Sequence, residues 1–291
     1  MTQITSLMPT TPLNPGALVT QAVTLYAKTF TRTLPFVSLM IGIHFLIGIL
    51  PQLPFIPSEG QINVLFMMGS ILLLPIVGGF IFFQRGILTV AQTLETSLIT
   101  SFRQLVALLL SLVYLSFIPL ILMTIGVASF LFLDPEKVND TIRLGILLST
   151  ATLTLLFLAN KILAPLFVVL EKEDANTAQE HVAKLTKGSY TSTLILGLIP
   201  MLILVGLFWV PTVLNIIFSD VNIPFGYVVF QGAGDALLAI IGPLMTLVIL
   251  LHINDLSLRK KGQFESEQKT MDQQYKDAAL KSKPPSDESM F

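Results

Sequence analysis

The sequence predicts an all-α fold: a polytopic membrane helical bundle with six transmembrane helices and three cytoplasmic amphipathic helices. Two observations predict this class. Six long apolar stretches lie between Leu34 and Ile253, and a helix needs about 20 apolar residues to cross ~30 Å of hydrocarbon. The chain is also 53% hydrophobic and only 12% charged, with a mean hydropathy of +0.78, whereas soluble domains contain about 25% charged residues.

The six apolar stretches are the predicted membrane spans. The residues before the first stretch lack a basic start followed by an apolar run and a small-residue cleavage site, so no signal peptide is predicted. We therefore expect the first stretch to act as the insertion signal. In chain order, the predicted spans are Leu34–Leu50, Ile62–Phe83, Leu105–Phe132, Ile142–Leu170, Thr193–Val213 and Tyr227–Leu251.

Lysine and arginine residues are concentrated on alternate connections. They occur before the first span, in the second and fourth connections, and above all in the C-terminal tail. The connections at residues 51–61 and 219–226 contain none, and the third connection contains only Lys137 and Arg143. Because basic residues favour the cytoplasmic side of a membrane, both termini are predicted to lie in the cytoplasm.

A short amphipathic helix is predicted before each odd-numbered span. The first has Asn14 as a suitable N-cap and Pro15 at its first helical position. The second covers roughly residues 86–103, and the third follows Asn176 and should end at Gly188. Its apolar stripe is Ala178, Val182 and Leu185. Such helices either lie in the headgroup region, with the apolar face in lipid, or pack beneath the bundle. The repeated unit is therefore a surface helix followed by an outward-turning hairpin of two spans.

The chain divides into a six-span membrane domain, residues 1–255, and a charged cytoplasmic tail, residues 256–291. The tail is rich in Lys, Glu, Gln, Asp and Ser, so we expect it to be partly disordered, above all from Pro284 onward. The basic run Arg259-Lys260-Lys261 follows the last span directly. We interpret it as a positive-inside anchor, with attraction for anionic lipid as the alternative.

Three ionisable residues lie inside the predicted spans: His44, Lys161 and Asp235. An ionisable group in a span is costly, which makes each of them a functional candidate. Helical rise places His44 and Lys161 at similar depths, ~15 Å from the cytoplasmic end, and Asp235 nearer the outer face. A direct pair between Lys161 and Asp235 is therefore not expected. The structural alternatives are a snorkelling lysine, a neutral histidine bonded to a neighbouring helix, and an aspartate in an outer vestibule.

Small residues and prolines suggest how the spans pack. Gly232, Ala236 and Ala239 form a stripe that predicts close contact with another helix. Internal prolines favour kinks, and the carbonyl groups that they free can line a cavity. These prolines are Pro75, Pro119, Pro165, Pro200 and Pro243.

Enzymatic and metal chemistry have little support in the sequence. The chain contains no cysteine, and its histidines, His44, His181 and His252, share no metal-ligand spacing. Nucleophile-elbow, phosphate-loop and dinucleotide motifs are absent. The net charge of -1 argues against nucleic-acid binding. We therefore expect no enzyme activity, no cofactor, no metal and no nucleic-acid partner.

Two neighbouring segments carry a family resemblance. The segment Leu158-Ala-Asn-Lys-Ile-Leu-Ala-Pro165 is followed by Glu171 and then by Ala178-Gln-Glu-His-Val-Ala-Lys-Leu-Thr-Lys-Gly188. Over residues 155–205 the chain resembles the YciC-like bacterial inner-membrane proteins and the related membrane domain fused to some glycerophosphodiester phosphodiesterases. Gln179 and Val182 depart from the usual Leu and Ser of that pattern. The resemblance implies a six-span inner-membrane protein without an established activity, and it does not imply the phosphodiesterase reaction.

Two functional classes follow from these observations. The first is a non-enzymatic protein for transport or lipid handling, which would use kinked spans and a cavity reached by Lys161 or Asp235. The second is a scaffold or accessory protein that docks protein partners through its cytoplasmic helices and tail. The lipid bilayer is the expected surrounding in both cases.

Overall fold

The computed structural model describes residues 7–49, 73, 75–88, 94–132, 139–218 and 226–281. Within these ranges all regular secondary structure is helical. One helix, Pro75–Leu88, carries no label. The labelled elements are α1 (Pro15–Ile49), α3 (Leu94–Arg103), α4 (Leu105–Phe132), α5 (Asp140–Lys161), α6 (Ala164–Leu170), α7 (Ala175–Thr186), α8 (Tyr190–Thr193), the π-helix η2 (Leu194–Leu198), α9 (Ile199–Ile217) and α10 (Gly226–Lys281).

Five helices of the described residues are long and apolar enough to cross a membrane, which indicates a multi-pass membrane protein. They correspond to the first, third, fourth, fifth and sixth predicted spans. Most of the second predicted span, Ile62–Phe83, lies outside the described residues, and its last part belongs to the shorter apolar helix Pro75–Leu88. The five candidate segments are Pro15–Ile47, Leu105–Phe130, Thr141–Leu170, Tyr190–Leu207 and Val228–Gly262.

Large apolar side chains are exposed along all of these helices, among them α4, α5 and α9. A soluble monomer rarely exposes a contiguous apolar patch larger than a few hundred Å². Such helices need an apolar surrounding, and lipid supplies it. The exposed residues include Val106, Leu110, Val113 and Phe117 on α4, Ile142, Leu148 and Leu153 on α5, and Leu202, Val205 and Trp209 on α9.

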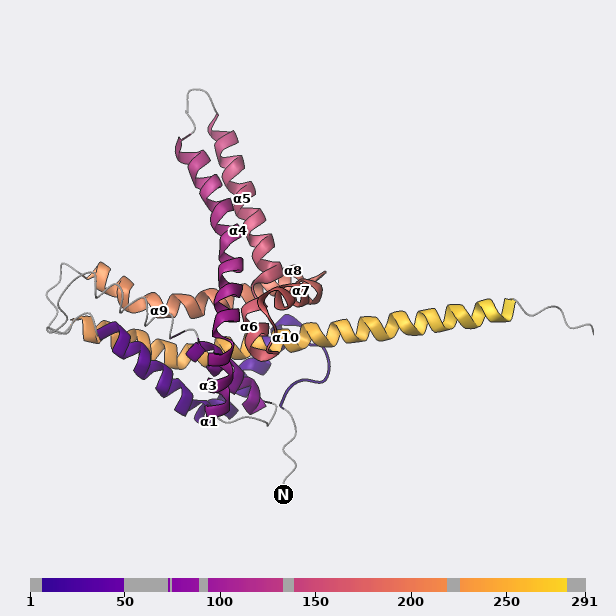
Figure 1. Cartoon of the computed structure of the whole chain (residues 1–291), viewed down its shortest axis with the longest axis horizontal. Helices are drawn as coiled ribbons and strands as arrows, with labels where there is room; N and C mark the ends of the chain where they lie inside the picture. Colours follow the sequence, from indigo (N-terminus) through magenta and orange to yellow (C-terminus); the bar gives the residue numbers. More distant parts are fainter. Residues whose placement is uncertain are drawn as a thin grey trace, which may run out of the picture.

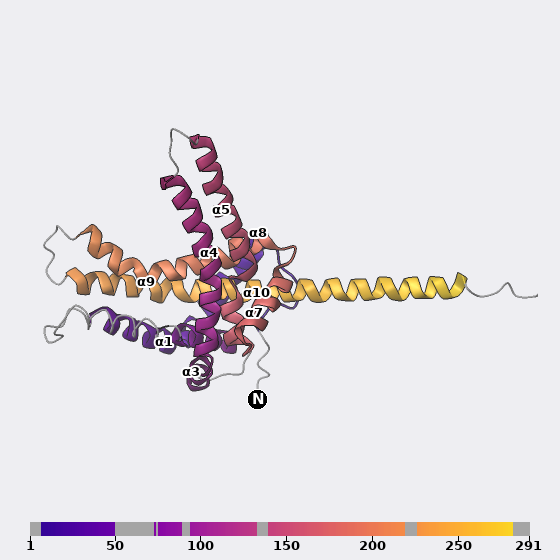
Figure 2. The same ribbon diagram turned by 45° about the horizontal axis from the view of Figure 1, so that its top comes forward.

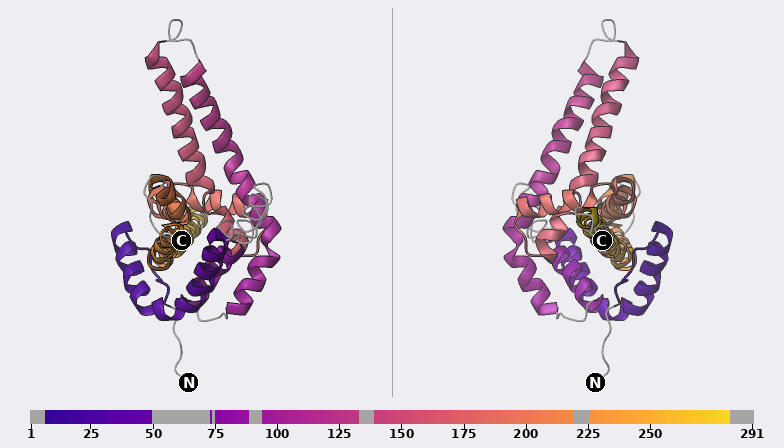
Figure 3. Two further views of the ribbon diagram at one scale, coloured as in Figure 1. Left: turned by 90° about the vertical axis from the view of Figure 1, so that its left-hand side faces the viewer. Right: turned by 90° about the vertical axis from the view of Figure 1, so that its right-hand side faces the viewer.

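The long helices form two groups that meet at one junction. Helices α4 and α5 make an antiparallel hairpin that projects away from the rest of the molecule (Figure 1; Figure 2). Helix α9 and the first half of α10 run side by side, with α1 next to them. Seen along the length of α10, the α4–α5 hairpin rises from this second group (Figure 3). The second half of α10 continues past the bundle as a single helix (Figure 1).

The junction between the two groups is the larger apolar core. All seven residues of α6 are buried, and α7 packs directly on α6. The predicted stripe of α7, Ala178, Val182 and Leu185, is buried in this core, as expected for an amphipathic helix. The expected stop after α7 is also confirmed, because Gly188 has a φ of 83° just beyond the helix end. The helix begins earlier than predicted, since Asp174 is its N-cap and Asn176 lies inside it.

Helix α1 combines the first predicted surface helix and the first predicted span in one continuous element. It begins at Pro15, and the side chain of Asn14 accepts a hydrogen bond from Ala17 N–H, so the predicted cap is confirmed. Asp255 accepts a hydrogen bond from Leu13 N–H at 2.7 Å, and Tyr26 donates to Ile240 O at 2.9 Å. The first half of α1 therefore runs along α10 between residues 255 and 240 and does not form a separate helix.

The second half of α1 follows a different path. From Tyr26 to His44 the helix covers 18 residues, which is ~27 Å at 1.5 Å per residue. Tyr26 contacts Ile240 of α10, and His44 contacts Asp235 of α10. These two contacted residues are only five residues apart, or ~8 Å along α10. A straight α1 cannot meet both contacts, so α1 bends between them. Pro35 lies inside this part of the helix, and proline is a usual cause of sharp bends.

Close packing between α9 and α10 occurs at a glycine that the sequence pattern did not single out. A Cβ atom at Gly234 would lie 2.6 Å from Cγ of Pro211, so the two helices touch there. In the predicted stripe, a Cβ at Gly232 meets no atom within 4 Å and Ala236 is exposed. The prediction for those two residues was wrong, because the face of α10 that contacts α9 carries Gly234 and neither Gly232 nor Ala236.

Candidate functional site

A histidine and an aspartate from distant parts of the chain meet inside the bundle. His44 lies near the C-terminal end of α1, and Asp235 lies in the third turn of α10. Nδ1 of His44 is 2.5 Å from Oδ1 of Asp235, and the two residues are only 7% and 3% exposed. The sequence predicted both residues as candidates but placed them at different depths. That placement was wrong, because it assumed that the cytoplasmic helix and the first span are separate and that the span runs straight.

A third buried polar residue, Gln231, contacts both members of this pair. It lies one turn before Asp235 on α10 and is 2% exposed. Its Nε2 atom is 3.2 Å from His44 Nδ1, 3.4 Å from His44 O and 3.4 Å from Asp235 Oδ1. An amide nitrogen is a donor only. When His44 Nδ1–H donates to Asp235, the amide of Gln231 therefore donates to Asp235 Oδ1 and to the His44 carbonyl.

The second oxygen of the aspartate is available for further chemistry. Oδ2 of Asp235 is buried and has no hydrogen-bond partner among the described residues. A buried polar atom without a partner costs about 1–3 kcal/mol. This oxygen can carry a proton or accept a hydrogen bond from a water molecule or a bound donor.

The surroundings of the pair are apolar. Met40, one turn before His44, and Leu238, one turn after Asp235, belong to one buried cluster. Phe36 and Phe80 belong to the same cluster, and their rings lie 5.7 Å apart. Electrostatic interactions are stronger in such a low-dielectric environment than in water. The attraction between the two side chains is consequently stronger here than it would be in water.

Lys161 does not join this cluster. It is the last residue of α5, and its Nζ atom donates to Gln179 O on α7 at 3.2 Å. It therefore contacts α7 and not the His44–Asp235 pair. The reason is local: the chain turns at Ile162 and Leu163, and α6 begins immediately afterwards with Pro165 in its first turn. The expectation that Lys161 and Asp235 do not pair agrees with these contacts.

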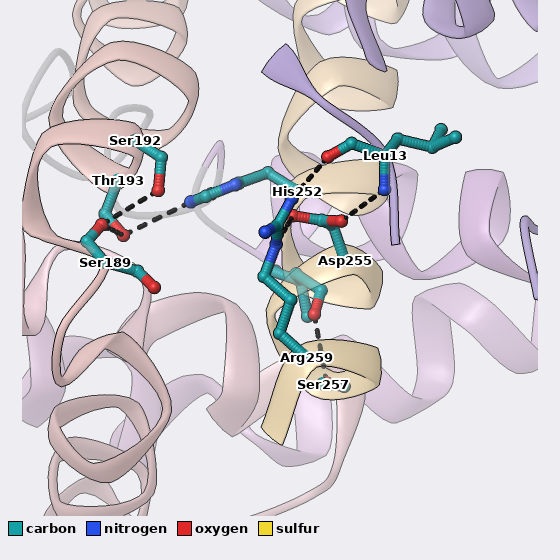
Figure 4. A network of polar contacts seen from close by, with 9 residues as sticks. Leu13, Ser189, Ser192, Thr193, His252, Asp255, Ser257 and Arg259 are labelled. Atoms are coloured by element: carbon teal, nitrogen blue, oxygen red, sulfur yellow. Dashed lines mark hydrogen bonds and ion pairs between the residues drawn. The ribbon is translucent and has the colours of Figure 1, made fainter. Parts of the chain in front are cut away.

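A second polar network lies where α8 and α10 meet the start of α1 (Figure 4). His252 is fully buried on α10, and its Nε2 is 3.2 Å from Oγ1 of Thr193, the last residue of α8. The two oxygens of Asp255 accept hydrogen bonds from Leu13 N–H and from Arg259 Nε–H, each at 2.7 Å. These contacts join three segments of the chain that the sequence separates widely.

Sequence reasoning missed three members of these clusters: Gln231, His252 and Asp255. One signal was available in each case. Gln231 precedes Asp235 by four residues, which places both side chains on one face of a helix. His252 and Asp255 are three residues apart and therefore also share a face. Their partners on α1 and α8 could not be found in this way.

The clusters do not have the composition of a metal centre. Within the described part of the chain, no group of three or more His, Asp or Glu residues is placed to hold a metal ion. The His44–Asp235 pair offers one imidazole and one carboxylate. What it can do chemically is bind and release a proton, or hold a polar ligand at Asp235 Oδ2.

Comparison of the chain with protein-family models, with curated proteins and with solved structures gave no match.

Proposed function

We propose that this chain is a non-enzymatic protein of a bacterial inner membrane that acts in transport or lipid handling, with the His44–Asp235 pair as its proton-binding group. The single observation that carries the proposal is an ionisable pair, with 2.5 Å between its atoms, buried between two helices that are long enough to span a membrane. Ionisable residues inside membrane spans typically line pathways for protons, ions or substrates.

The energetic cost of the pair supports this reading. Removing two charges from water costs several kcal/mol per ion, and well-packed apolar residues often replace a buried ion pair without loss of stability. Helix packing alone therefore gives little reason for a histidine and an aspartate at this position. A proton-binding role does give one, because a proton added to the aspartate breaks the charge pair and changes the contact between α1 and α10.

Further buried polar groups follow α10 toward its other end. Gln84 donates to Pro243 O at 2.8 Å, eight residues or ~12 Å along the helix from Asp235. His252 lies nine residues further on, or ~13 Å. Buried polar contacts therefore join α10 to neighbouring helices at more than one level along its length.

Topology and location belong to the same proposal. Lys and Arg residues are concentrated in the segments predicted to be cytoplasmic, which favours cytoplasmic termini and six spans. The resemblance of residues 155–205 to the YciC-like proteins supports an inner membrane. The amphipathic character of α7, with one buried and one exposed face, fits a helix beneath the bundle on the cytoplasmic side.

One observation favours a scaffold as the second candidate. Helix α10 continues without a break from the candidate span, which ends at Gly262, to Lys281. That extension covers 19 residues, or ~28 Å, and stands clear of the other helices (Figure 1). A helix of this length is suited to contact a protein partner.

Complementation of a deletion strain distinguishes the two candidates. His44→Gln and Asp235→Asn should each abolish complementation while membrane abundance stays normal, and truncation of residues 263–291 should preserve it. Thr246→Val is the matched control, because Thr246 is equally buried on α10 and its hydroxyl donates only to Gly242 O of the same helix. If both pair variants complement and the truncation does not, the scaffold replaces the proposed transport role.

A further inference from the structure

A cavity of about 360 Å³ lies at the end of the bundle opposite the His44–Asp235 pair. It is bounded by the end of α7, by the connection from α7 to α8, by α10 and by the segment before α1. Its volume falls in the range of small-ligand pockets, about 300–1,000 Å³. The lining residues are Pro12, Leu185, Lys187, Gly188, Ser189, Leu256, Arg259 and Lys260.

The charged side chains that line this cavity are all basic. Three lining residues are basic and none is acidic. The guanidinium of Arg259 is held by Asp255, which compensates its charge. The ammonium groups of Lys187 and Lys260 have no carboxylate partner among the described residues. Lys260 Nζ donates to Lys187 O at 3.0 Å, which leaves two of its three N–H donors free to bind a ligand.

The connection from α7 to α8 shapes the wall of the cavity. Gly188 has a φ of 83°, which turns the chain between the two helices. A Cβ atom at Gly188 would meet no atom within 4 Å, so this wall faces open space. Ser189 follows and adds a hydroxyl group to the lining. The polar network of Figure 4 lies directly behind it, since Ser189 O accepts the hydroxyl hydrogen bonds of Thr193 and Ser192.

The cavity lies toward the end of the candidate span of α10, where we place a headgroup layer of the bilayer. The candidate span of α10 starts at Val228, and Leu256 and Lys260 follow it by 28 and 32 residues. These separations correspond to ~42 and ~48 Å along the helix. A bilayer with both headgroup layers is about 40–45 Å thick. The apolar side chains of Leu185, Leu256 and Pro12 complete a lining that is basic on one side and apolar on the other.

We propose that this cavity binds the phosphate group of an anionic phospholipid headgroup. The two unpaired ammonium groups and the Ser189 hydroxyl supply donors for the phosphate oxygens, and the apolar lining accommodates the adjoining glycerol. Basic pockets between membrane helices bind anionic headgroups in this way. The bound lipid would hold α7, α8 and α10 together at the network of His252 and Asp255. This inference does not depend on the proposed transport role.

Binding is tested on the full-length protein in detergent, with thermal unfolding as the readout. Added phosphatidylglycerol should raise the unfolding temperature, and phosphatidylcholine, whose headgroup has no net charge, should have a much smaller effect. Each lysine near a membrane surface contributes roughly a fivefold gain in affinity, so Lys187→Gln/Lys260→Gln should weaken phosphatidylglycerol binding about 30-fold.

The control variant is Lys28→Gln/Lys184→Gln. It removes the same charge from two exposed lysines that do not line the cavity, and it should retain wild-type affinity. Ser189→Asp is a second variant that adds negative charge to the cavity without removing a lysine, and it should also lose binding. Helical content measured by circular dichroism establishes that each variant is folded.

Two outcomes would overturn the proposal. In the first, the pocket variants and the control bind phosphatidylglycerol equally, and the interaction is a general effect of surface charge. In the second, millimolar inorganic phosphate alone gives the full shift and competes with the lipid, and the ligand is then a soluble phosphate.

Discussion

At the residue scale, the buried contact between His44 and Asp235 is the most specific feature of the candidate site. They are 191 residues apart in the chain, yet their side chains form one buried pair with Gln231. Each partner makes the other tolerable in an apolar core, because a lone buried charge is far more costly than a paired one. Their contributions to stability should therefore be strongly coupled.

This coupling can be measured in a double-mutant cycle. His44→Leu alone should destabilise the protein by about 3 kcal/mol, because it leaves the Asp235 carboxylate buried without its partner. The double variant His44→Leu/Asp235→Leu should recover most of that loss, since apolar residues often replace a buried ion pair at little cost. Unfolding in mixed detergent micelles, followed by circular dichroism, gives the free energies. Additive effects of the two substitutions would show that the residues do not interact.

A second prediction at this scale concerns pH and the N-cap of α7. Hydrogen bonds from the Thr177 hydroxyl, and then from the backbone N–H groups of Thr177 and Asn176, lower the pKa of Asp174 below its ordinary value of 3.8. Because the pKa is lower in the folded state, the ionised carboxylate stabilises the fold at pH values above the unfolded-state pKa. This contribution to stability is lost as the pH falls through the folded-state pKa. Asp174→Ala should therefore weaken α7 at neutral pH and have little effect in strong acid. Hydrogen exchange of the α7 amides should follow this pattern, and an equal difference at all pH values would argue against it.

At the scale of elements, the path of α1 and the contact between α9 and α10 bring the polar residues together. The bend in α1 near Pro35 lets one helix contact α10 at Asp255, Ile240 and Asp235. Gly234, the neighbour of Asp235, sets how closely α9 approaches. A change in either feature should move the pair even though it touches neither side chain.

Two glycines on α10 give a matched test of this contact. Gly234→Ala would place a methyl group 2.6 Å from Pro211 Cγ, so the helices must separate. Such overpacking costs typically 1–3 kcal/mol. Gly232→Ala meets open space and should instead stabilise by up to about 1 kcal/mol through helix propensity. The same micelle unfolding assay compares the two variants, and an equal effect of both would exclude a close contact at Gly234.

At the scale of the whole molecule, the exposed apolar surfaces of α4, α5 and α9 are suited to contact with lipid. The two helical groups share one junction, built from α6 and α7, and the basic cavity lies at the edge of that junction. The direction of insertion follows from the distribution of Lys and Arg residues, which predicts that the connection at residues 51–61 faces outward and that the tail faces the cytoplasm.

The orientation is directly testable because the chain contains no cysteine. Glu59→Cys should react in intact cells with a thiol reagent that does not cross the membrane. Ser266→Cys, in the extension of α10, should react only after the cells are permeabilised. The cysteine-free parent protein is the background control. Labelling of Ser266→Cys and not of Glu59→Cys in intact cells would reverse the proposed topology.

Features that depend on neighbouring residues were predictable from the sequence. The cap at Asn14, the end of α7 before Gly188 and the buried stripe Ala178, Val182 and Leu185 were all predicted correctly. Five of the six predicted spans coincide with helices of sufficient length and apolar character. Each of these depends on hydropathy, periodicity or capping within about 20 residues, which is what a sequence displays.

Contacts between helices were decided only by the tertiary structure. Hydropathy singled out His44, Lys161 and Asp235, but helical rise along straight spans could not show that α1 bends, that α5 ends at Lys161, or that Gly234 and not Gly232 faces α9. Such contacts depend on how helices far apart in the chain cross one another, and short-range sequence patterns carry no record of those crossings. The sequence by itself thus determined that this chain is a bundle of apolar helices with a few costly polar residues. The tertiary structure decided which of those residues meet, because only the packed bundle sets the direction and depth of each side chain.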